Sequence, residues 1–338
     1  MSEPETSIVA TGLGKRYGSH TAIRDLTFSV RKGEIVGFLG PNGAGKSTTL
    51  RIITGILDAS RGQLTVCGLP VPYHAAEIRR RIGYMPENNP LPEDMRVIEY
   101  LRLRARLKGI PARQRKARVE HAMEVCELHH KARRRIIGTL SKGFRQRVGI
   151  ADAILAAPDI TILDEPTIGL DPHQVLSIRQ LLDNLRGQTT VIFSSHILSE
   201  VEISCDRVLI LNQGYLVAQG TPAELRREFL PGTRFQAEVA ARSGTLEAAL
   251  QPLAGDWGIA IDPRANGEFA AVLLSCPAPD ADGEALLARL NSLPGLRVRA
   301  FRALEPGLEE IFLTATRRSW QVPREEIETL TPSPLPPP

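Results

Sequence analysis

The segment with the most specific chemistry is a glycine-rich loop that matches G-x-x-x-x-G-K-[ST], with the residues Gly40-Pro41-Asn42-Gly43-Ala44-Gly45-Lys46-Ser47. An apolar run precedes this loop and a helical pattern opens at Thr48, which we count with the phosphate site. Small residues let backbone N–H groups surround phosphates, Lys46 supplies a cation, and the Ser47 hydroxyl can bind Mg²⁺. The loop therefore predicts a bound nucleoside triphosphate.

Two neighbouring carboxylates, Asp164 and Glu165, follow the apolar run Ile160 to Leu163. At the carboxyl end of a strand, Asp164 can hold Mg²⁺ through water and Glu165 can act as the general base toward an attacking water. By themselves the two residues could equally be solvated charges after a core strand. The phosphate loop upstream favours the catalytic interpretation.

A third motif lies between them and resembles the signature of ATP-binding cassette (ABC) proteins, with the residues Leu140-Ser141-Lys142-Gly143-Phe144-Arg145-Gln146-Arg147. The family's other motifs occur in order: Tyr17 as the aromatic loop, Ile82-Gly83-Tyr84-Met85-Pro86-Glu87 at the Gln loop, Gly169-Leu170-Asp171 as the D-loop, and Ser194-Ser195-His196 at the switch histidine. The resemblance covers residues 8 to 225. No N-K-x-D guanine-binding motif competes with it.

The resemblance implies a mechanism in which two cassettes pack head to tail and each ATP lies between the phosphate loop of one and the signature of the other. Ser141 and Gly143 would then contact the γ-phosphate across the interface, Tyr17 would stack on adenine, and Asp171 would couple the two sites. His196 would hold the γ-phosphate and the attacking water. The implied cofactors are ATP and Mg²⁺. One chain carries both halves of a site, so a homodimer can complete two sites. The sequence does not decide between a homodimer and a heterodimer.

Three positions depart from the family pattern. Lys142 replaces the first of the paired signature glycines, and Phe144 stands where the family usually has Gln. Glu87 stands where Gln is commonest; it keeps an oxygen ligand for Mg²⁺ but adds negative charge beside Asp164 and Glu165. These departures leave the predicted ligand unchanged and leave the turnover rate open.

The elements that must position these residues form an α/β pattern. Continuous apolar runs alternate with helical spacing over the first two thirds of the chain, which predicts a parallel core sheet covered by helices. Earlier segments alternate more and carry Gly turns, which predicts an antiparallel β edge. We predict a nucleotide-binding domain over residues 1–228, of the ABC type of phosphate-loop NTPase, with a helical insertion at about 93–142.

A second pattern follows the Pro231-Gly232 break. Its order, βαββαβ and a further helix, predicts a small α+β ferredoxin-like domain over residues 234–317, either regulating the cassette or only buttressing it. Residues 318–338 are rich in Pro, Glu and Thr, and we expect a disordered tail there.

The composition excludes several classes of protein. The chain has 338 residues, 42% of them hydrophobic and 24% charged, which fits about two globular domains. No apolar stretch approaches the ~20 residues of a membrane-spanning helix, and the acidic N-terminus lacks a secretory signal. The four cysteines are widely separated, which predicts buried thiols. The net charge is only +4, and the arginines of the insertion lack interleaved aromatics, so we expect no nucleic-acid partner.

A soluble ATPase of this family must pass its motion to another molecule, and in transporters that partner is a separate membrane permease. The segment Ile82 to Val97, the signature and the late segment Leu308-Glu309-Glu310-Ile311-Phe312-Leu313 resemble subunits of ABC-2 type exporters, nearest to the gliding-motility, multidrug and copper-processing subset. We therefore expect a peripheral protein on the cytoplasmic face of the membrane. Two alternatives stay open: a non-transport ABC ATPase that remodels a macromolecule, and a regulatory cassette with weak turnover.

Overall fold

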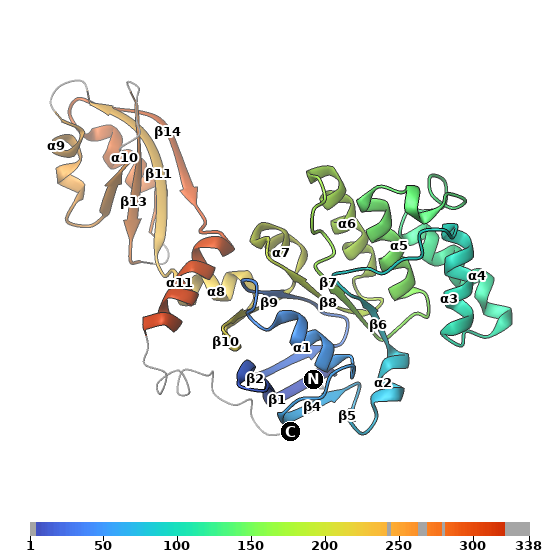
Figure 1. Cartoon of the computed structure of the whole chain (residues 1–338). Helices are drawn as coiled ribbons and strands as arrows, with labels where there is room; N and C mark the ends of the chain where they lie inside the picture. The colour runs from blue at the N-terminus through green and yellow to red at the C-terminus, as the bar shows by residue number, and fades with distance from the viewer. Residues whose placement is uncertain (1–4, 242–244, 263–268, 279–280, 322–338) are drawn as a thin grey trace. The chain divides into compact units, whose positions relative to one another are not determined.

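The computed structural model describes residues 5–241, 245–262, 269–278 and 281–321. The chain forms two compact units, one of Met1–Pro222 with the residues from Ala315 onward, the other of Ala223–Thr314. Each unit has its own hydrophobic core. Figure 1 shows both units, with most of their helices and strands labelled.

The first unit is built on a mixed sheet, which in the described chain has the strand order β5-β4-β1-β2-β10-β9-β3-β8-β7-β6. The strands from β9 to β6 pair in parallel, whereas β1, β2, β4 and β5 pair antiparallel, as does β10 with β9. This arrangement confirms the predicted parallel core with an antiparallel edge. The strand bounds are β1 Thr6–Tyr17, β2 His20–Arg31, β3 Ile35–Leu39, β4 Arg61–Val66, β5 Leu69–Val71, β6 Ile82–Met85, β7 Ile160–Asp164, β8 Thr190–Ser195, β9 Arg207–Asn212 and β10 Tyr215–Gly220.

The central strands lie in the middle of this unit, with helices on the sheet. Every residue of β3, β7 and β8 is buried, which explains their continuous apolar, β-branched sequences. The helix bounds are α1 Lys46–Ile53, α2 Ala75–Arg81, α3 Val97–Leu107, α4 Ala112–Val125, η1 Ile137–Thr139, α5 Lys142–Ile154, α6 Pro172–Leu185 and α7 Leu198–Ser204. The loops that enter α1 and leave β7 therefore start from rigid strand ends.

The helical insertion consists of α3 and α4, which pack beyond α5 on the side of the unit away from β1 and β2 (Figure 1). A charged cluster joins α3 to α5. The carboxylate of Asp152 accepts a hydrogen bond from Arg104 Nε at 2.9 Å, and Lys108 Nζ lies 3.5 Å from Asp152 Oδ1. Lys108 also donates to the Asp152 backbone oxygen at 2.7 Å, and burial lowers its pKa. The cluster thus holds α3 against α5 in the first unit.

Replacing Asp152 should loosen this junction. Asp152→Asn is expected to lower the free energy of unfolding by about 2 kcal/mol, because two partly buried cations lose their counter-charge. Asp183→Asn is the matched control, since among the described residues Asp183 forms a surface ion pair with Arg186 at 3.7 Å, and its loss should change stability by less than about 0.5 kcal/mol. Urea unfolding followed by circular dichroism measures both. Equal midpoints for the two variants would contradict a structural role for the cluster.

The second unit contains a four-stranded antiparallel sheet in the order β12-β13-β11-β14. Helices α9 and α10 supply Leu250, Leu286 and Leu290 to its core, and Phe235 stacks on Phe301 with ring centroids 5.0 Å apart. The strand order is that of the predicted ferredoxin-like sandwich. The bounds are α8 Pro222–Phe229, β11 Thr233–Ala241, α9 Leu246–Leu250, η2 Gln251–Leu253, β12 Gly258–Ile261, β13 Ala270–Cys276, α10 Gly283–Ser292 and β14 Leu296–Leu304.

The last helix, α11, runs over Leu308–Gln321 and so continues into the range predicted as a tail. Leu308, Ile311 and Ala315 are buried at helical spacing, which stabilises the helix. Residues 322–338 of the predicted tail lie outside the described residues.

Candidate functional site

The predicted phosphate loop lines a pocket of about 650 Å³. The loop leaves the buried end of β3 and enters α1, whose N-cap is Gly45. Gly45 has φ 103°, and a Cβ there would lie 2.9 Å from the Ala22 backbone oxygen, so both the turn and the close approach require glycine. The other lining residues are Tyr17, His20, Ala22, Pro41, Asn42, Gly43, Ala44, Lys46, Ser47, Thr48, Glu87, Glu165, Ile168 and His196.

Three charged or ionisable side chains meet in this pocket from distant parts of the sequence. Lys46 Nζ donates to the Gly40 backbone oxygen at 2.7 Å and lies 3.5 Å from Glu165 Oε1. The other oxygen of this carboxylate, Oε2, is 2.7 Å from His196 Nδ1. Lys46 and Glu165 are buried, whereas His196 is about half exposed. The Glu165 carboxylate is thus held between the Lys46 ammonium and the His196 imidazole.

Asp164 lies behind this group and fits a divalent cation. Its Oδ1 accepts hydrogen bonds from Ser194 Oγ at 2.6 Å and from Ser47 Oγ at 3.2 Å. Its Oδ2 is buried and has no hydrogen-bond partner among the described atoms. A buried carboxylate oxygen without a donor is costly unless a cation or an ordered water binds it. Ser47, Asp164 and the lining residue Glu87 are oxygen donors of the kind that Mg²⁺ prefers.

No group of three or more His, Cys, Asp or Glu side chains with metal-binding geometry occurs among the described residues. Mg²⁺ does not require one, since it usually keeps several waters and takes only one or two protein carboxylates together with substrate phosphates. The donor set therefore fits a Mg²⁺ ion that arrives with a nucleotide.

Ser194 was named in the sequence only as part of the switch-histidine motif, with no role of its own. Besides bonding Asp164, its Oγ accepts a hydrogen bond from the Glu165 backbone N–H at 2.9 Å, so one buried hydroxyl orients both carboxylate residues. Glu165 has φ 51°, a left-handed conformation that is uncommon for residues other than glycine. Such strain persists at functional sites where the surroundings determine the backbone. The only signal in the sequence was the position of Ser194 two residues before His196.

Tyr17 and His20 also line the pocket, at the turn between β1 and β2. Tyr17 is 45% exposed, and Lys15 Nζ lies 5.2 Å from its ring centroid. An exposed aromatic ring beside a phosphate pocket can stack on a planar base. His20 was also missed, because a lone histidine after a Gly turn carries no pattern.

The predicted signature and D-loop residues do not line this pocket. Ser141 is the N-cap of α5, where its side chain accepts a hydrogen bond from the Phe144 backbone N–H at 3.5 Å. Asp171 is the N-cap of α6, accepting from the Gln174 backbone N–H at 3.0 Å. A Cβ built on Gly143 would lie 2.5 Å from Gln174 Oε1, so the starts of these two helices are neighbours. Within one chain they form a second, separate surface.

The three departures from the family pattern fall at different places. Glu87 lines the phosphate pocket. Lys142 lies against the D-loop of its own chain, since its Nζ would be 2.3 Å from a Cβ built on Gly169. Phe144 lines a different pocket, together with Glu127 and Arg147. Only Glu87 therefore changes the charge of the described phosphate pocket.

Comparisons with known proteins identify the family. The family described as "ABC transporter" matches residues 23–168. The Nod factor export ATP-binding protein I of Burkholderia orbicola (strain AU 1054) is 34% identical over 308 residues, which are 91% of this chain and 96% of the relative. This chain belongs to the ATP-binding subunits of ABC transporters.

Solved structures agree with this assignment. A structure described as the ATP-binding subunit of an ABC transporter is 34% identical and matches with a TM-score of 0.59 over 66% of this chain and 93% of that chain. A dimeric bacterial ABC transporter cassette is 26% identical, with a TM-score of 0.58 over 63% of this chain and 98% of that chain. The protein described here is accordingly an ABC ATPase that binds ATP.

Within this ABC subunit, none of the described helices is both long and apolar enough to cross a lipid bilayer.

Proposed function

We propose that this ABC subunit hydrolyses MgATP at a head-to-tail dimer interface and thereby drives a separate membrane permease. The observation that supports the proposal is the separation of the two half-sites: Lys46 and Glu165 line the phosphate pocket, whereas Ser141 and Asp171 cap helices outside it. A signature that lies apart from the pocket of its own chain is suited to meet the pocket of a second chain. A homodimer would complete two identical sites.

The proposed roles follow from the chemistry of each side chain. Ser47, Asp164 and Glu87 would hold Mg²⁺, which when bound neutralises phosphate charge. Glu165 would take a proton from the attacking water. His196, bonded to Glu165 Oε2, would orient that carboxylate and contact the γ-phosphate. Across the interface, the Ser141 hydroxyl and the Gly143 N–H would bind the γ-phosphate, with Asp171 coupling the two sites; Tyr17 would stack on adenine.

We further propose an exporter of the ABC-2 type. The relative named for Nod factor export matches 91% of this chain, including the second unit and not only the cassette. The segment Ile82 to Val97, the signature and α11 carry the same resemblance. The subunit would sit at the cytoplasmic face of the membrane and contact its permease through α3 and α4, next to Glu87. The permease would choose the substrate.

The dimer can be tested by sedimentation. In the Glu165→Gln background ATP should drive monomers into dimers, because the nucleotide bridges two subunits and hydrolysis no longer separates them. Ser141→Arg in the same background is the matched variant: it places a bulky side chain at the signature, outside the phosphate pocket, and should bind ATP but stay monomeric. A monomer at saturating ATP without the second substitution would argue against a homodimer.

We also propose that the cassette and the second unit are separate domains, with the second unit taking no direct part in hydrolysis. A chain that ends at Glu228 is expected to stay folded and bind ATP, because the buried cluster around the sheet of the first unit is built from residues between Ile8 and Leu211, with Leu216 packed against it. Equilibrium binding of a fluorescent ATP analogue measures this. Aggregation, or loss of nucleotide binding, would assign residues 234–317 to the cassette's own core.

A further inference from the structure

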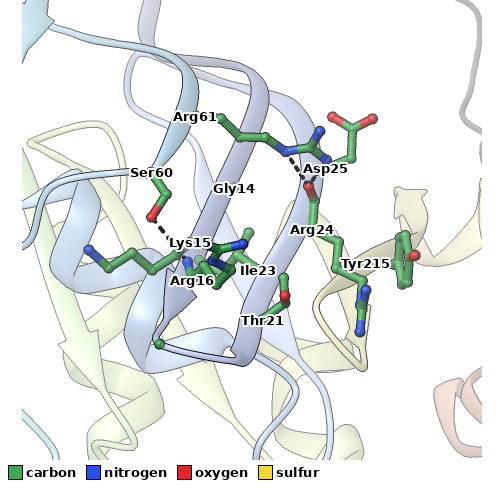
Figure 2. A pocket seen from close by; sticks show the side chains of 11 residues that line it. Gly14, Lys15, Arg16, Thr21, Ile23, Arg24, Asp25, Ser60, Arg61 and Tyr215 are labelled. Carbon is green, nitrogen blue, oxygen red and sulfur yellow. Dashed lines mark hydrogen bonds between the residues drawn. The ribbon is translucent and has the colours of Figure 1, made fainter.

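We propose that this protein has a second ligand site, a basic pocket on the antiparallel strands of the first unit that binds a molecule with two or more phosphate groups. The pocket has a volume of about 620 Å³, close to the 650 Å³ of the ATP pocket. None of its lining residues lines the ATP pocket, although Lys15 also contacts the ring of Tyr17 there. Its polar walls, drawn in Figure 2, include Lys15, Arg16, Arg24, Arg61, Asp25 and Tyr215.

The pocket concentrates positive charge. Four cations line it, and Asp25 is the sole acidic side chain among the described lining residues. No ion pair joins any of these four cations to a carboxylate in the described part of the chain, although such pairs are common elsewhere on the same unit. Like charges gathered in a concave surface raise the local potential and attract anions. The missing counter-charge is what a bound anion would supply.

Arg61 is placed across the pocket by a specific arrangement (Figure 2). Its Nε donates to the Arg24 backbone oxygen at 3.0 Å, and one of its terminal nitrogens bonds the same oxygen. A Cβ on Gly14 would lie 2.6 Å from the Arg61 side chain, so glycine is required for Arg61 to cross there. Next to it, Ser60 Oγ accepts a hydrogen bond from the Arg16 backbone N–H at 3.1 Å. These contacts orient the basic wall without neutralising it.

Arg24 and Tyr215 form the facing wall, and they lie side by side in Figure 2. The Arg24 guanidinium is 5.5 Å from the Tyr215 ring centroid, a cation–π contact between β2 and β10. This contact restricts the guanidinium but uses none of its N–H donors. Arginine presents these donors as a planar fork that matches phosphate oxygens. Arg24 is therefore oriented in advance for a phosphate.

The class of ligand follows from charge and size. Four cations and Asp25 give the pocket a net charge of +3. A single phosphate group, at about −1.5 to −2, would leave part of this charge unbalanced, whereas two or three linked phosphates would balance all of it. The volume lies within the ~300–1,000 Å³ of small-molecule sites and leaves room for a group beyond the phosphates. This chemistry occurs in free polyphosphates and nucleotides and in a diphosphorylated lipid headgroup, so the test must separate a soluble from a membrane source.

The test is calorimetric titration of the full-length Lys46→Ala protein, in which the ATP pocket is disabled, with inorganic tripolyphosphate. The membrane arm is co-sedimentation with phosphatidylcholine vesicles that contain cardiolipin. We expect at least one probe to bind, and Arg16→Gln/Arg24→Gln to raise its dissociation constant at least tenfold. The double variant Arg102→Gln/Arg106→Gln on α3 is the control, because it removes the same net charge from exposed positions outside the pocket. It should change the dissociation constant of the probe less than twofold.

The proposal is overturned if neither probe binds. It is also overturned if the double variants in the pocket and on α3 weaken binding equally, because binding would then depend only on the net charge of the protein. Binding of tripolyphosphate alone identifies a soluble ligand, and binding of vesicles alone a lipid headgroup. If the double variant fails to fold by circular dichroism, Arg16→Gln is used, since Arg16 is exposed. No arm measures ATP hydrolysis, so failure here is distinct from failure of the proposed transport function.

Discussion

The variant Glu165→Gln should lose ATP turnover by about 10²–10⁴-fold while still binding ATP, because glutamine keeps the size of the side chain but cannot accept a proton. In the structure, the Glu165 carboxylate lies 2.7 Å from His196 Nδ1 and 3.5 Å from Lys46 Nζ, facing the phosphate pocket. The amide can retain the hydrogen bond to His196. Nucleotide binding should therefore survive, and only the chemical step should slow. Phosphate release at saturating MgATP measures the turnover.

Glu77→Gln provides the matched control, since Glu77 is an exposed carboxylate on α2, outside the pocket. It should leave turnover within about twofold of the unmodified protein. Unchanged hydrolysis in Glu165→Gln would remove Glu165 from the role of base, whereas loss of ATP binding as well would indicate that its charge holds the pocket together.

The second large effect is expected from Lys46→Ala, which should weaken ATP binding by about 10²-fold or more and abolish hydrolysis. Lys46 is buried at the start of α1 and is anchored to the Gly40 backbone oxygen at 2.7 Å, so its ammonium is fixed beside the phosphates. Two charge-assisted hydrogen bonds to phosphate contribute about 1.5–3 kcal/mol each. Their loss accounts for the expected fall in affinity.

Fluorescent ATP analogue binding measures this effect, with Lys116→Ala on the exposed face of α4 as the control that removes one cation elsewhere. Lys46→Ala also leaves Glu165 buried without its cation, so thermal unfolding must be followed in parallel. ATP binding at unchanged affinity by a folded Lys46→Ala protein would refute the assignment of the phosphate loop.

The sequence alone determined the elements that carry the site, because their signals are local. The phosphate loop, its preceding strand and the start of α1 lie within 19 consecutive residues, Ile35 to Ile53, and depend on neighbouring residue types only. The continuous apolar runs of β3, β7 and β8 likewise reflect burial on both faces of the sheet. The βαββαβ order of the second unit was readable for the same reason, since each strand and helix has its own period.

Only the tertiary structure decided how the distant residues meet. Ser194 bonds to both Asp164 and the Glu165 backbone, a contact across 30 residues that depends on β7 and β8 being parallel neighbours in one register. The left-handed backbone of Glu165 and the position of Lys142 over Gly169 carry no pattern in the sequence. The basic pocket needs Arg24, Arg61 and Tyr215 from three separate strands. Periodicity and motif spacing predict the secondary structure of each segment, whereas side-chain contacts between distant segments depend on how the whole sheet packs.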